Sequence, residues 1–283
     1  MADILKGAPV TGALCEKTKA SSDSLRARGV SPTLAIIRVG EREDDIAYER
    51  SAIKRCGTMG VDAKNIILPL SVTQAELISE IEKLNRDASV HGVLLLRPLP
   101  KHLDEKLICE ALSPQKDVDG ITSASLAGVF TGSGAGFAPC TAQACMEILD
   151  YYGVDCTGKK AAVIGRSLVV GKPAAVMLIG KNATVTVCHT KTRELQKTVQ
   201  GAEIVIAAAG KAGAVDASFL SEGQIVVDVG INVADDGRIC GDVNFDEAEK
   251  IVAAITPVPG GVGGVTAAVL ISHVVEAAER ANQ

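Results

Sequence analysis

One glycine-rich turn lies between a run of apolar residues and a segment with helical periodicity. It reads Lys160-Ala-Ala-Val-Ile-Gly165-Arg-Ser-Leu-Val-Val-Gly171-Lys-Pro173, which predicts a buried strand, a tight turn and the start of a helix. The free amide groups at a helix N-terminus favour an anionic phosphate, so this turn indicates a dinucleotide site. The spacing departs from Gly-x-Gly-x-x-Gly, because Ser167 takes the place of the second glycine and Gly171 falls one residue late. An ordinary β-to-α turn is therefore the alternative.

The end of the next predicted strand helps to distinguish between two nicotinamide cofactors. Enzymes that use NAD place an acidic residue about 20 residues further on, where it binds the adenosine ribose. Here the strand ends Val187-Cys-His-Thr-Lys191, without a carboxylate. Arg166, Thr190 and Lys191 suit the additional phosphate of NADP, so we predict NADP, with NAD as the alternative. A solvated helix start is the alternative role of Lys191 and Arg193.

Eight cysteines are spread over the chain, and their spacing does not predict a metal site. They form no Cys-x-x-Cys motif and have no His-x-x-x-His partner. We therefore predict free thiols, as in proteins of a reducing compartment, and no bound metal.

Short runs rich in Val and Ile alternate with helical segments from residue 33 onward, which is typical of successive βα units. With 2% aromatic residues and no Trp, the core must be aliphatic, as in buried parallel sheets. We predict an α/β fold with two lobes, the second Rossmann-like with a parallel sheet. The predicted strands are 33–39, 65–70, 92–96, 160–164, 184–188, 203–208, 224–229 and 253–255. The predicted helices are 9–28, 44–59, 73–86, 104–112, 141–152, 169–180, 193–200, 246–252 and 266–281.

A boundary between the two lobes is predicted at residues 131–139. This segment, Thr-Gly-Ser-Gly-Ala-Gly-Phe-Ala-Pro, disfavours both helix and strand interiors. Because 283 residues with 47% apolar content suffice for two domains, we predict a first lobe at 1–138 and a nucleotide-binding lobe at 139–265. The last segment, 266–283, is expected to return to the first lobe.

Charge and hydropathy exclude several classes of partner. The net charge of -5 comes from scattered acidic and basic residues, without the clustered Lys and Arg that a nucleic-acid backbone requires. The N-terminus lacks the pattern of a signal peptide, and no stretch approaches the roughly 20 apolar residues that span a bilayer. We therefore expect a soluble cytoplasmic protein that binds neither nucleic acid nor a membrane.

Four segments together resemble the methylenetetrahydrofolate dehydrogenase/cyclohydrolase (FolD) family over nearly the whole chain. They are Lys116-Asp-Val-Asp-Gly120, Pro139-Cys-Thr141, the turn from Gly165 to Pro173, and Ile255-Thr-Pro-Val-Pro-Gly-Gly-Val-Gly263. Each segment is short, but their order and spacing are specific in combination. Further similar segments are Val39-Gly-Glu41 before Tyr48, Arg97-Pro-Leu-Pro100 and Asp228-Val-Gly-Ile-Asn232.

The resemblance implies an enzyme of one-carbon metabolism and purine biosynthesis. Its dehydrogenase activity would oxidise 5,10-methylenetetrahydrofolate to 5,10-methenyltetrahydrofolate, with hydride transfer to NADP. Its cyclohydrolase activity would convert the product to 10-formyltetrahydrofolate. The family is usually dimeric, which implies a homodimer, with folate between the lobes and NADP on the second lobe.

The resemblance also implies roles for individual residues. Tyr48 corresponds to the tyrosine that stacks on the folate ring, and Asp119 to the carboxylate that hydrogen-bonds the pterin; these two are the predicted catalytic residues. The loop 257–263 corresponds to a wall of the folate site, where glycines admit close approach of the substrate; the predicted contacts are Pro259, Gly260 and Gly261. The predicted cofactor contacts are Gly165, Arg166, Ser167, Thr190 and Ile231, with Ala209 and Gly210 near the nicotinamide.

Each of these roles has a simpler structural alternative. Asp119 could cap a helix at Ser123 or a turn, and Tyr48 could pack in the core. The loop 257–263 could be a plain connection between elements.

The sequence departs from the family at two positions that matter for the cyclohydrolase step. Bifunctional members carry an acid/base lysine four residues after the tyrosine, on the same helix face, and that position here is Ala52. Lys54 is no obvious substitute, because two further residues turn about 200° around the helix. The glutamine that precedes Leu-Pro-Leu-Pro in the family, and bonds that lysine, falls on Leu96. In the last loop Gly264 and Val265 replace a Pro-Met pair.

These departures affect the two reactions differently. Hydride transfer requires alignment and a nearby carboxylate, whereas hydrolysis requires proton transfers, for which a positioned acid/base contributes about 10²–10⁴-fold. We therefore expect weak or absent cyclohydrolase activity. The alternatives are a bifunctional enzyme in which Arg97, Lys54 or ordered water substitutes, a folate- or nucleotide-binding paralogue without catalysis, and a dehydrogenase for amino or hydroxy acids.

Overall fold

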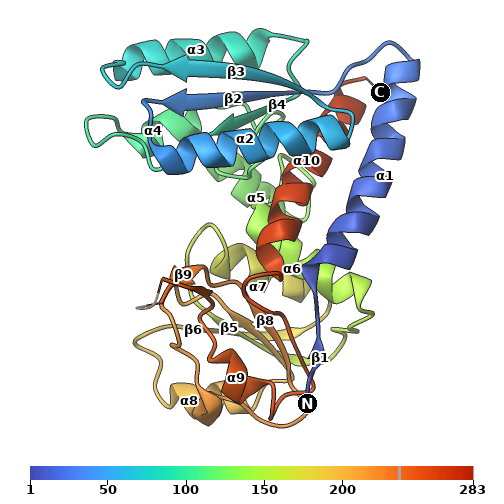
Figure 1. Cartoon of the computed structure of the whole chain (residues 1–283), viewed down its shortest axis with the longest axis vertical. Coiled ribbons are helices and arrows are strands. Elements are labelled where there is room, and N and C mark those ends of the chain that lie inside the picture. The colour runs from blue at the N-terminus through green and yellow to red at the C-terminus, as the bar shows by residue number, and fades with distance from the viewer. Residues whose placement is uncertain (235–236, 283) are drawn as a thin grey trace. The chain divides into compact units, whose positions relative to one another are not determined.

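The computed structural model describes residues 1–234 and 237–282, which form two compact units (Figure 1). Unit 1 comprises Met1–Gly12 and Thr141–Thr266, and unit 2 comprises Ala13–Cys140 and Ala267–Gln283. Each unit contains a parallel sheet with helices, so the predicted α/β fold is confirmed. The division differs from the expected one at residues 1–12. These lie in unit 1 because β1 (Asp3–Ile4) pairs with β11 (Ala254–Ile255).

The sheet of unit 2 has three parallel strands in the order β3 (Asp62–Leu68), β2 (Thr33–Val39) and β4 (Gly92–Leu95). Its central strand is buried from Leu34 to Val39, as expected for a strand covered on both faces. The helices of this part of the chain are α1 (Gly7–Ala27), α2 (Glu43–Thr58), α3 (Gln74–Arg86), α4 (Glu105–Glu110) and α5 (Ser123–Thr131).

Helix α3 illustrates how local sequence fixes an element of this unit. Thr73 accepts a hydrogen bond from the backbone N–H of Glu76, whose carboxylate accepts from the Thr73 backbone in return, so a capping box starts the helix. Leu77, Ile81 and Leu84 recur at helical spacing and are buried. Their side chains form one core with the aliphatic residues of β2 and β4.

Helix α2 is fixed to its sheet by a buried ion pair. Arg38 Nε of β2 donates to Glu49 Oε2 at 2.6 Å, and Asn65 Nδ2 of β3 donates to the other carboxylate oxygen at 2.8 Å. Arg38 and Glu49 are both buried. Because loss of one partner would leave a buried charge unpaired, this contact defines where α2 lies and therefore where the adjacent Tyr48 lies.

The sheet of unit 1 has six parallel strands in the order β1-β11-β8-β7-β5-β6. Its other strands are β5 (Lys160–Ile164), β6 (Thr184–Cys188), β7 (Ile204–Ala207) and β8 (Ile225–Asp228). After β5 the chain pairs first on one side, as β6, and then on the other, as β7. The carboxyl end of β5 is thus a topological switch point, where open α/β sheets bind ligands.

Several shorter elements complete unit 1. Its helices are α6 (Cys140–Tyr151), α7 (Gly171–Gly180), α8 (Leu195–Gln200), α9 (Phe245–Ala248) and the 3₁₀ turn Ala217–Phe219. The hairpin strands β9 (Asn232–Val233) and β10 (Ile239–Cys240) pair antiparallel. The core of this unit is aliphatic, as its composition predicts.

Helix α10 (Val262–Ala281) closes the chain. Among the described residues it is the one helix whose length and apolar character would also suit a membrane span, although 61% of its apolar window is buried inside the protein. In unit 2 it contributes His273, whose ring lies 5.0 Å from that of Phe137, and Arg280, which lies over the Phe137 ring at 4.4 Å. These contacts identify its C-terminal part as a packed core helix.

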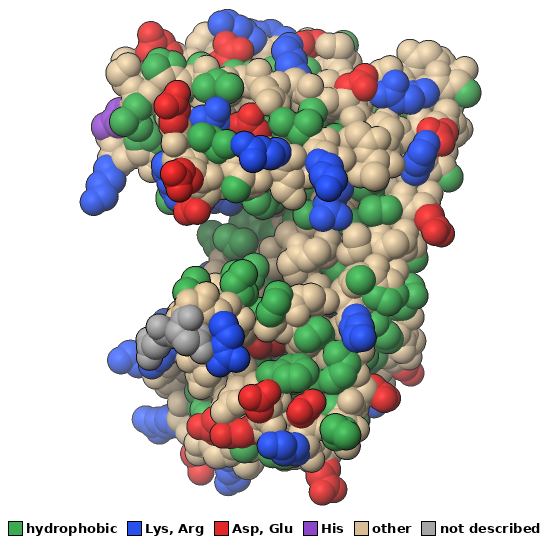
Figure 2. Space-filling view, viewed as in Figure 1, with side chains coloured by type: hydrophobic (Ala, Val, Ile, Leu, Met, Phe, Trp, Pro, Cys, Tyr) green, Lys and Arg blue, Asp and Glu red, His purple; other side chains and the backbone are tan. Residues whose placement is uncertain are grey.

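Charged side chains of both signs are interspersed on the face of the molecule drawn in Figure 2. Lys and Arg do not gather there into a continuous basic surface. The visible face therefore offers no counterpart to the phosphate backbone of a nucleic acid.

Candidate functional site

A pocket of about 260 Å³ lies in unit 2 and brings both predicted catalytic residues together. Tyr48 comes from α2, and Asp119 follows the turn after Lys116. The remaining lining residues are Arg42, Asp44, Asp45, Leu94, Leu95, Leu96 and Arg97. Tyr48 is 44% exposed, so core packing does not account for it. The pocket thus joins an aromatic surface to a carboxylate.

Asp119 is held in an environment that disfavours its charge. Burial raises the pKa of this carboxyl to about 6; Arg97 opposes the rise and Asp117 adds to it. The Arg97 Nη2 atom lies 3.8 Å from Asp119 Oδ2. Near neutral pH Asp119 is therefore largely a carboxylate that accepts hydrogen bonds, and it titrates close to the physiological range.

Neighbouring residues take the capping role that was the alternative for Asp119. Thr122 is the N-cap of α5 and accepts from the backbone N–H of Ser125. The Asp117 carboxylate accepts from the backbone N–H groups of Ile121 and Thr122 and from the Ser125 hydroxyl. The sequence did not single out Asp117; the repeated aspartate in Asp117-Val-Asp119 was the available signal. Because Asp117 binds the backbone N–H groups of this turn, the Asp119 carboxylate is not needed there and lines the pocket.

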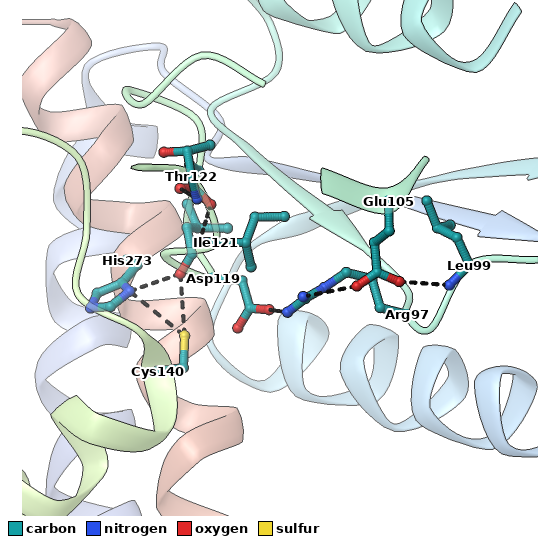
Figure 3. A network of polar contacts seen from close by, with 10 residues as sticks. Arg97, Leu99, Glu105, Asp119, Ile121, Thr122, Cys140 and His273 are labelled. Carbon is teal, nitrogen blue, oxygen red and sulfur yellow. Dashed lines mark hydrogen bonds and ion pairs between the residues drawn. The ribbon is translucent and has the colours of Figure 1, made fainter. Parts of the chain in front are cut away.

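The carbonyl group just before Asp119 is fixed by two further side chains (Figure 3). His273 Nδ1 donates to Val118 O at 2.8 Å, and Cys140 Sγ donates to the same oxygen at 3.2 Å. Burial is the main cause that raises the pKa of the Cys140 thiol well above its ordinary value, and the negative charge of Asp119 raises it further. Cys140 is thus a protonated structural thiol and not a nucleophile. His273 lies 155 residues from its carbonyl partner, so spacing did not reveal it.

Although the Tyr48 side chain as a whole is 44% exposed, its hydroxyl group is desolvated, and this raises the pKa of the hydroxyl. Asp119 and Cys140 contribute in the same direction, and Arg55 opposes them. Its hydroxyl therefore stays protonated across the neutral range. Ala52, one turn later on α2, is only 6% exposed and belongs to the buried stripe of this helix. Leu96 lines the pocket beside Tyr48.

In unit 1 the glycine turn has the geometry that a close ligand approach requires. Gly165 has φ +126, and a Cβ there would lie 2.1 Å from Ala208 O. A Cβ on Gly171 would lie 2.2 Å from Gly165 O, so both positions need glycine. Val170 provides no side-chain cap to α7. The Lys172 N–H donates to Ser167 O at 3.0 Å and Pro173 has no N–H, so Gly171 is the residue of the first turn whose N–H can meet a bound anion. Arg166 and Ser167 are exposed beside this turn.

The predicted phosphate-binding residues of β6 lie at the same sheet edge. Strands β5 and β6 pair in parallel with Ile164 opposite Cys188, so Gly165 and Thr190 both follow the carboxyl ends of adjacent strands. Thr190 and Lys191 are exposed. The segment 188–193 contains no acidic residue. This chemistry fits the additional phosphate of NADP better than a ribose hydroxyl.

Two buried aspartates organise the loops that follow β7 and β8. Asp242 accepts from the backbone N–H groups of Gly210 and Lys211 at 2.9 and 3.0 Å. Asp228 accepts from the backbone N–H groups of Gly230, Asp242 and Val243. Sequence reasoning gave neither aspartate a role, because their partners come from separate loops. Together they hold the predicted nicotinamide residue Gly210 and the start of the Ile231 loop.

A second pocket, of about 200 Å³, unites predicted substrate and cofactor residues of unit 1. Ile231 and the loop residues Pro259, Gly260 and Gly261 line it together. The loop 257–263 is therefore the wall of a pocket as well as a connection between β11 and α10. Among residues 1–234 and 237–282, no group of three His, Cys, Asp or Glu side chains is placed to hold a metal ion. All eight cysteines are free.

Two models of known protein families match this chain, each over a different part of it. Residues 5–119 match the family model described as tetrahydrofolate dehydrogenase/cyclohydrolase, catalytic domain. Residues 139–282 match the model described as tetrahydrofolate dehydrogenase/cyclohydrolase, NAD(P)-binding domain. The chain belongs to the tetrahydrofolate dehydrogenase/cyclohydrolase family.

Individual members of this family are similar over their full length. The bifunctional protein FolD of Clostridium kluyveri is 45% identical over 280 residues, which is 99% of each chain. The crystal structure of the bifunctional FolD enzyme of Campylobacter jejuni is 39% identical, covers 99% of each chain and superposes with a TM-score of 0.96. A FolD structure from Trypanosoma brucei, complexed with NADP and an inhibitor, is 34% identical, covers 100% of this chain and 99% of its own, and has a TM-score of 0.92.

Membership in the tetrahydrofolate dehydrogenase/cyclohydrolase family confirms the prediction of an enzyme. The NAD(P)-binding domain and the NADP-bound relative confirm the prediction of NADP as cofactor. The glycine turn of unit 1 fits such a cofactor, because Gly165 and Gly171 let the backbone approach a phosphate group closely.

Proposed function

We propose that this enzyme oxidises 5,10-methylenetetrahydrofolate to 5,10-methenyltetrahydrofolate with NADP and hydrolyses the methenyl product only weakly. The supporting observation is the lining of the unit 2 pocket. Tyr48 and Asp119 are present there, while its cations, among the described residues, are the two guanidinium groups of Arg42 and Arg97. Ala52 and Leu96 stand where bifunctional family members carry the acid/base lysine and its glutamine partner.

The oxidation step requires little beyond alignment in this pocket. The Tyr48 ring packs against the pterin, and the Asp119 carboxylate accepts hydrogen bonds from the pterin donors. NADP, when bound, supplies the nicotinamide ring that accepts the hydride. The cation left on the folate is delocalised over its flanking nitrogens, and no proton has to move. Positioning alone can therefore account for a large share of the rate.

The hydrolysis step requires a group that exchanges a proton near neutral pH. A guanidinium group has a pKa above about 12 and donates hydrogen bonds without releasing a proton. The Tyr48 hydroxyl is held protonated by burial, which raises its pKa. Asp119 titrates closer to this range, but its carboxylate is assigned to the hydrogen-bond donors of the pterin, and Ala52 and Leu96 have no titratable group. The loss of a positioned acid/base therefore lowers the expected hydrolysis rate by about 10²–10⁴-fold.

The cofactor is held by the carboxyl ends of the strands of unit 1. Gly165 and Ser167 lie against the pyrophosphate, while Arg166 and Thr190 face the additional phosphate. Ala209, Gly210 and Ile231 lie near the nicotinamide, and Pro259, Gly260 and Gly261 contact the substrate. We further propose that residues 1–138, joined by 266–283, form the folate-binding domain and that residues 139–265 form the cofactor domain. We also propose that the enzyme is a cytoplasmic homodimer.

The test measures oxidation and hydrolysis separately on purified protein. Wild-type protein is expected to oxidise methylenetetrahydrofolate with NADP while hydrolysing methenyltetrahydrofolate slowly. The double variant Ala52→Lys/Leu96→Gln is expected to raise hydrolysis by about 10²-fold or more, because it restores a titratable group and its hydrogen-bond partner. Ser51→Lys is the matched control, since Ser51 is exposed on the same helix and its new ammonium group points to solvent.

Two outcomes contradict the proposal in different ways. Robust hydrolysis by the wild-type protein would mean that another group serves as the acid/base. Binding of NADP and folate without any turnover would instead favour the non-catalytic binding protein. A titration of each ligand, made before the turnover assay, separates these cases.

A further inference from the structure

Arg97 brings a guanidinium group into the pocket that contains Tyr48 and Asp119. Arg97 follows β4 directly and lines the pocket with Tyr48 and Asp119. Its side chain is 26% exposed, which places the charge at the pocket wall and away from bulk solvent.

The guanidinium group is held from both sides by carboxylates (Figure 3). Arg97 Nη1 lies 3.5 Å from Glu105 Oε1, and Arg97 Nη2 lies 3.8 Å from Asp119 Oδ2. Glu105 is itself fixed, because its other oxygen accepts from the Leu99 backbone N–H at 2.9 Å. The chain of contacts runs from the start of α4 through Arg97 to the carboxylate assigned to the pterin.

We propose that Arg97 is a positioning residue that replaces the charge of the missing lysine and holds Asp119 ionised and aimed into the pocket. This inference rests on the proposed function for the identity of the substrate. A guanidinium group restores the positive charge but exchanges no proton near neutral pH. Arg97 thus supplies the positive charge that the Asp119 carboxylate needs, and it supplies no acid/base group for hydrolysis.

The charge balance around Asp119 explains why a cation is needed there. The groups that face it are Asp117 from its own turn, the Cys140 thiol from α6 and the Tyr48 hydroxyl from α2. None of them carries positive charge, and Asp117 is an acid. The positive charge beside Asp119 comes from Arg97, which lowers the pKa of the Asp119 carboxyl. Without it, burial and Asp117 would both favour the protonated carboxyl.

The first experiment measures the ionisation of Asp119 directly, without any substrate. Carboxyl ¹³C NMR of aspartate-labelled protein gives its titration midpoint, with the signal assigned by Asp119→Asn. Arg97→Leu is expected to raise the titration midpoint of Asp119 by about 0.5–1 pH unit. This shift is small for the loss of an ion pair, because the Arg97–Asp119 pair is partly exposed to solvent. Arg97→Gln should give the same rise, whereas Arg97→Lys should return the midpoint to near the wild-type value.

The second experiment follows the pH dependence of methylenetetrahydrofolate oxidation. The acidic limb of kcat/KM is expected to move upward in Arg97→Leu by the same amount as the NMR midpoint, and to recover in Arg97→Lys. Arg50→Leu is the matched control, because Arg50 is an exposed cation of α2 outside the pocket. That variant should leave both quantities unchanged.

The two experiments separate this inference from the proposed function. An NMR midpoint that does not move in Arg97→Leu and Arg97→Gln overturns the role of Arg97, whatever the turnover. A midpoint that moves and is rescued by lysine supports it, even if the protein oxidises no methylenetetrahydrofolate. In the latter case only the proposed function fails.

Discussion

Tyr48 combines an aromatic ring with a hydroxyl group, and substitution can separate their contributions. If the ring stacks on the pterin, Tyr48→Phe should leave the KM for methylenetetrahydrofolate within about 3-fold, while Tyr48→Leu should raise it about 2–10-fold through loss of aromatic contact. Steady-state oxidation kinetics measure both values. Tyr151→Leu is the control, since Tyr151 is similarly exposed but lies on α6 in unit 1.

The pH profile gives a second measure of the same residue. Because the pKa of Tyr48 is raised, its hydroxyl stays protonated well beyond its ordinary range. Ionisation of Tyr48 should therefore not lower the oxidation rate between pH 7 and about 9.5. The wild-type protein and Tyr48→Phe should have the same pH profile in this range. A decline in that range that is absent from the phenylalanine variant would show that the hydroxyl ionises during turnover.

At this scale the sequence singled out residues that line the pocket, but it did not single out the residues that support them. Tyr48 and Asp119 stand in recognisable motifs, and the pocket contains both. His273 and Asp242 act through backbone groups of other loops, at separations of 155 and 32 residues. A hydrogen bond to a distant carbonyl leaves no periodic trace in a sequence, so these residues emerge only from the folded chain.

At the scale of elements, the β5–α7 turn makes a sharp prediction about its glycines. Gly171→Ala would place a Cβ within 2.2 Å of Gly165 O, so strand and helix must separate, at a cost of about 1–3 kcal/mol. The variant should melt at a lower temperature and bind NADP more weakly. Thermal unfolding and NADP titration measure these effects.

The same helix provides the control for this substitution. Gly180 ends α7 and has no heavy atom within 4 Å of the position of its missing Cβ. Gly180→Ala should leave NADP affinity unchanged and alter stability by less than about 1 kcal/mol, since alanine only favours the helix. Equal losses in both variants would mean that close packing at Gly171 is not the cause.

Most long elements agree with the sequence pattern. Strand β3 is an exception, because it spans Asp62–Leu68 and not the expected 65–70; its first residues are exposed and are defined by pairing with β2. Strands β2, β5 and β6 have the predicted bounds, because buried runs of branched residues are distinctive. Helix α5 (Ser123–Thr131) was not predicted; its composition is mostly small and apolar, with no clear polar face. The two-residue strands β1, β9 and β10 are defined by their partners, and no local pattern can indicate them.

At the scale of the whole molecule, NADP is expected to add to global stability. A ligand that binds only the native state stabilises it by about 2.7 kcal/mol at 100 times its Kd. NADP should therefore raise the melting temperature more than NAD at equal concentration. Arg166→Ala should lower NADP affinity by about 10-fold or more, through loss of a charged contact, and leave NAD binding within about 3-fold.

Differential scanning fluorimetry with each cofactor measures this preference. Lys197→Ala serves as the control, because Lys197 is an exposed residue of α8 whose recorded ion pair is with Glu194. Equal melting shifts with NADP and NAD in the wild-type protein would contradict the assignment of Arg166 to the additional phosphate.

The edge strand β1 has a consequence for how the chain reaches this fold. Asp3 pairs with Ala254, so β1 and β11 join segments that are far apart in the sequence. Contacts this distant in sequence form slowly, and an unpaired β11 edge would be open to strands of other molecules. A variant in which β1 cannot pair would therefore expose the edge of β11 to strands of other molecules.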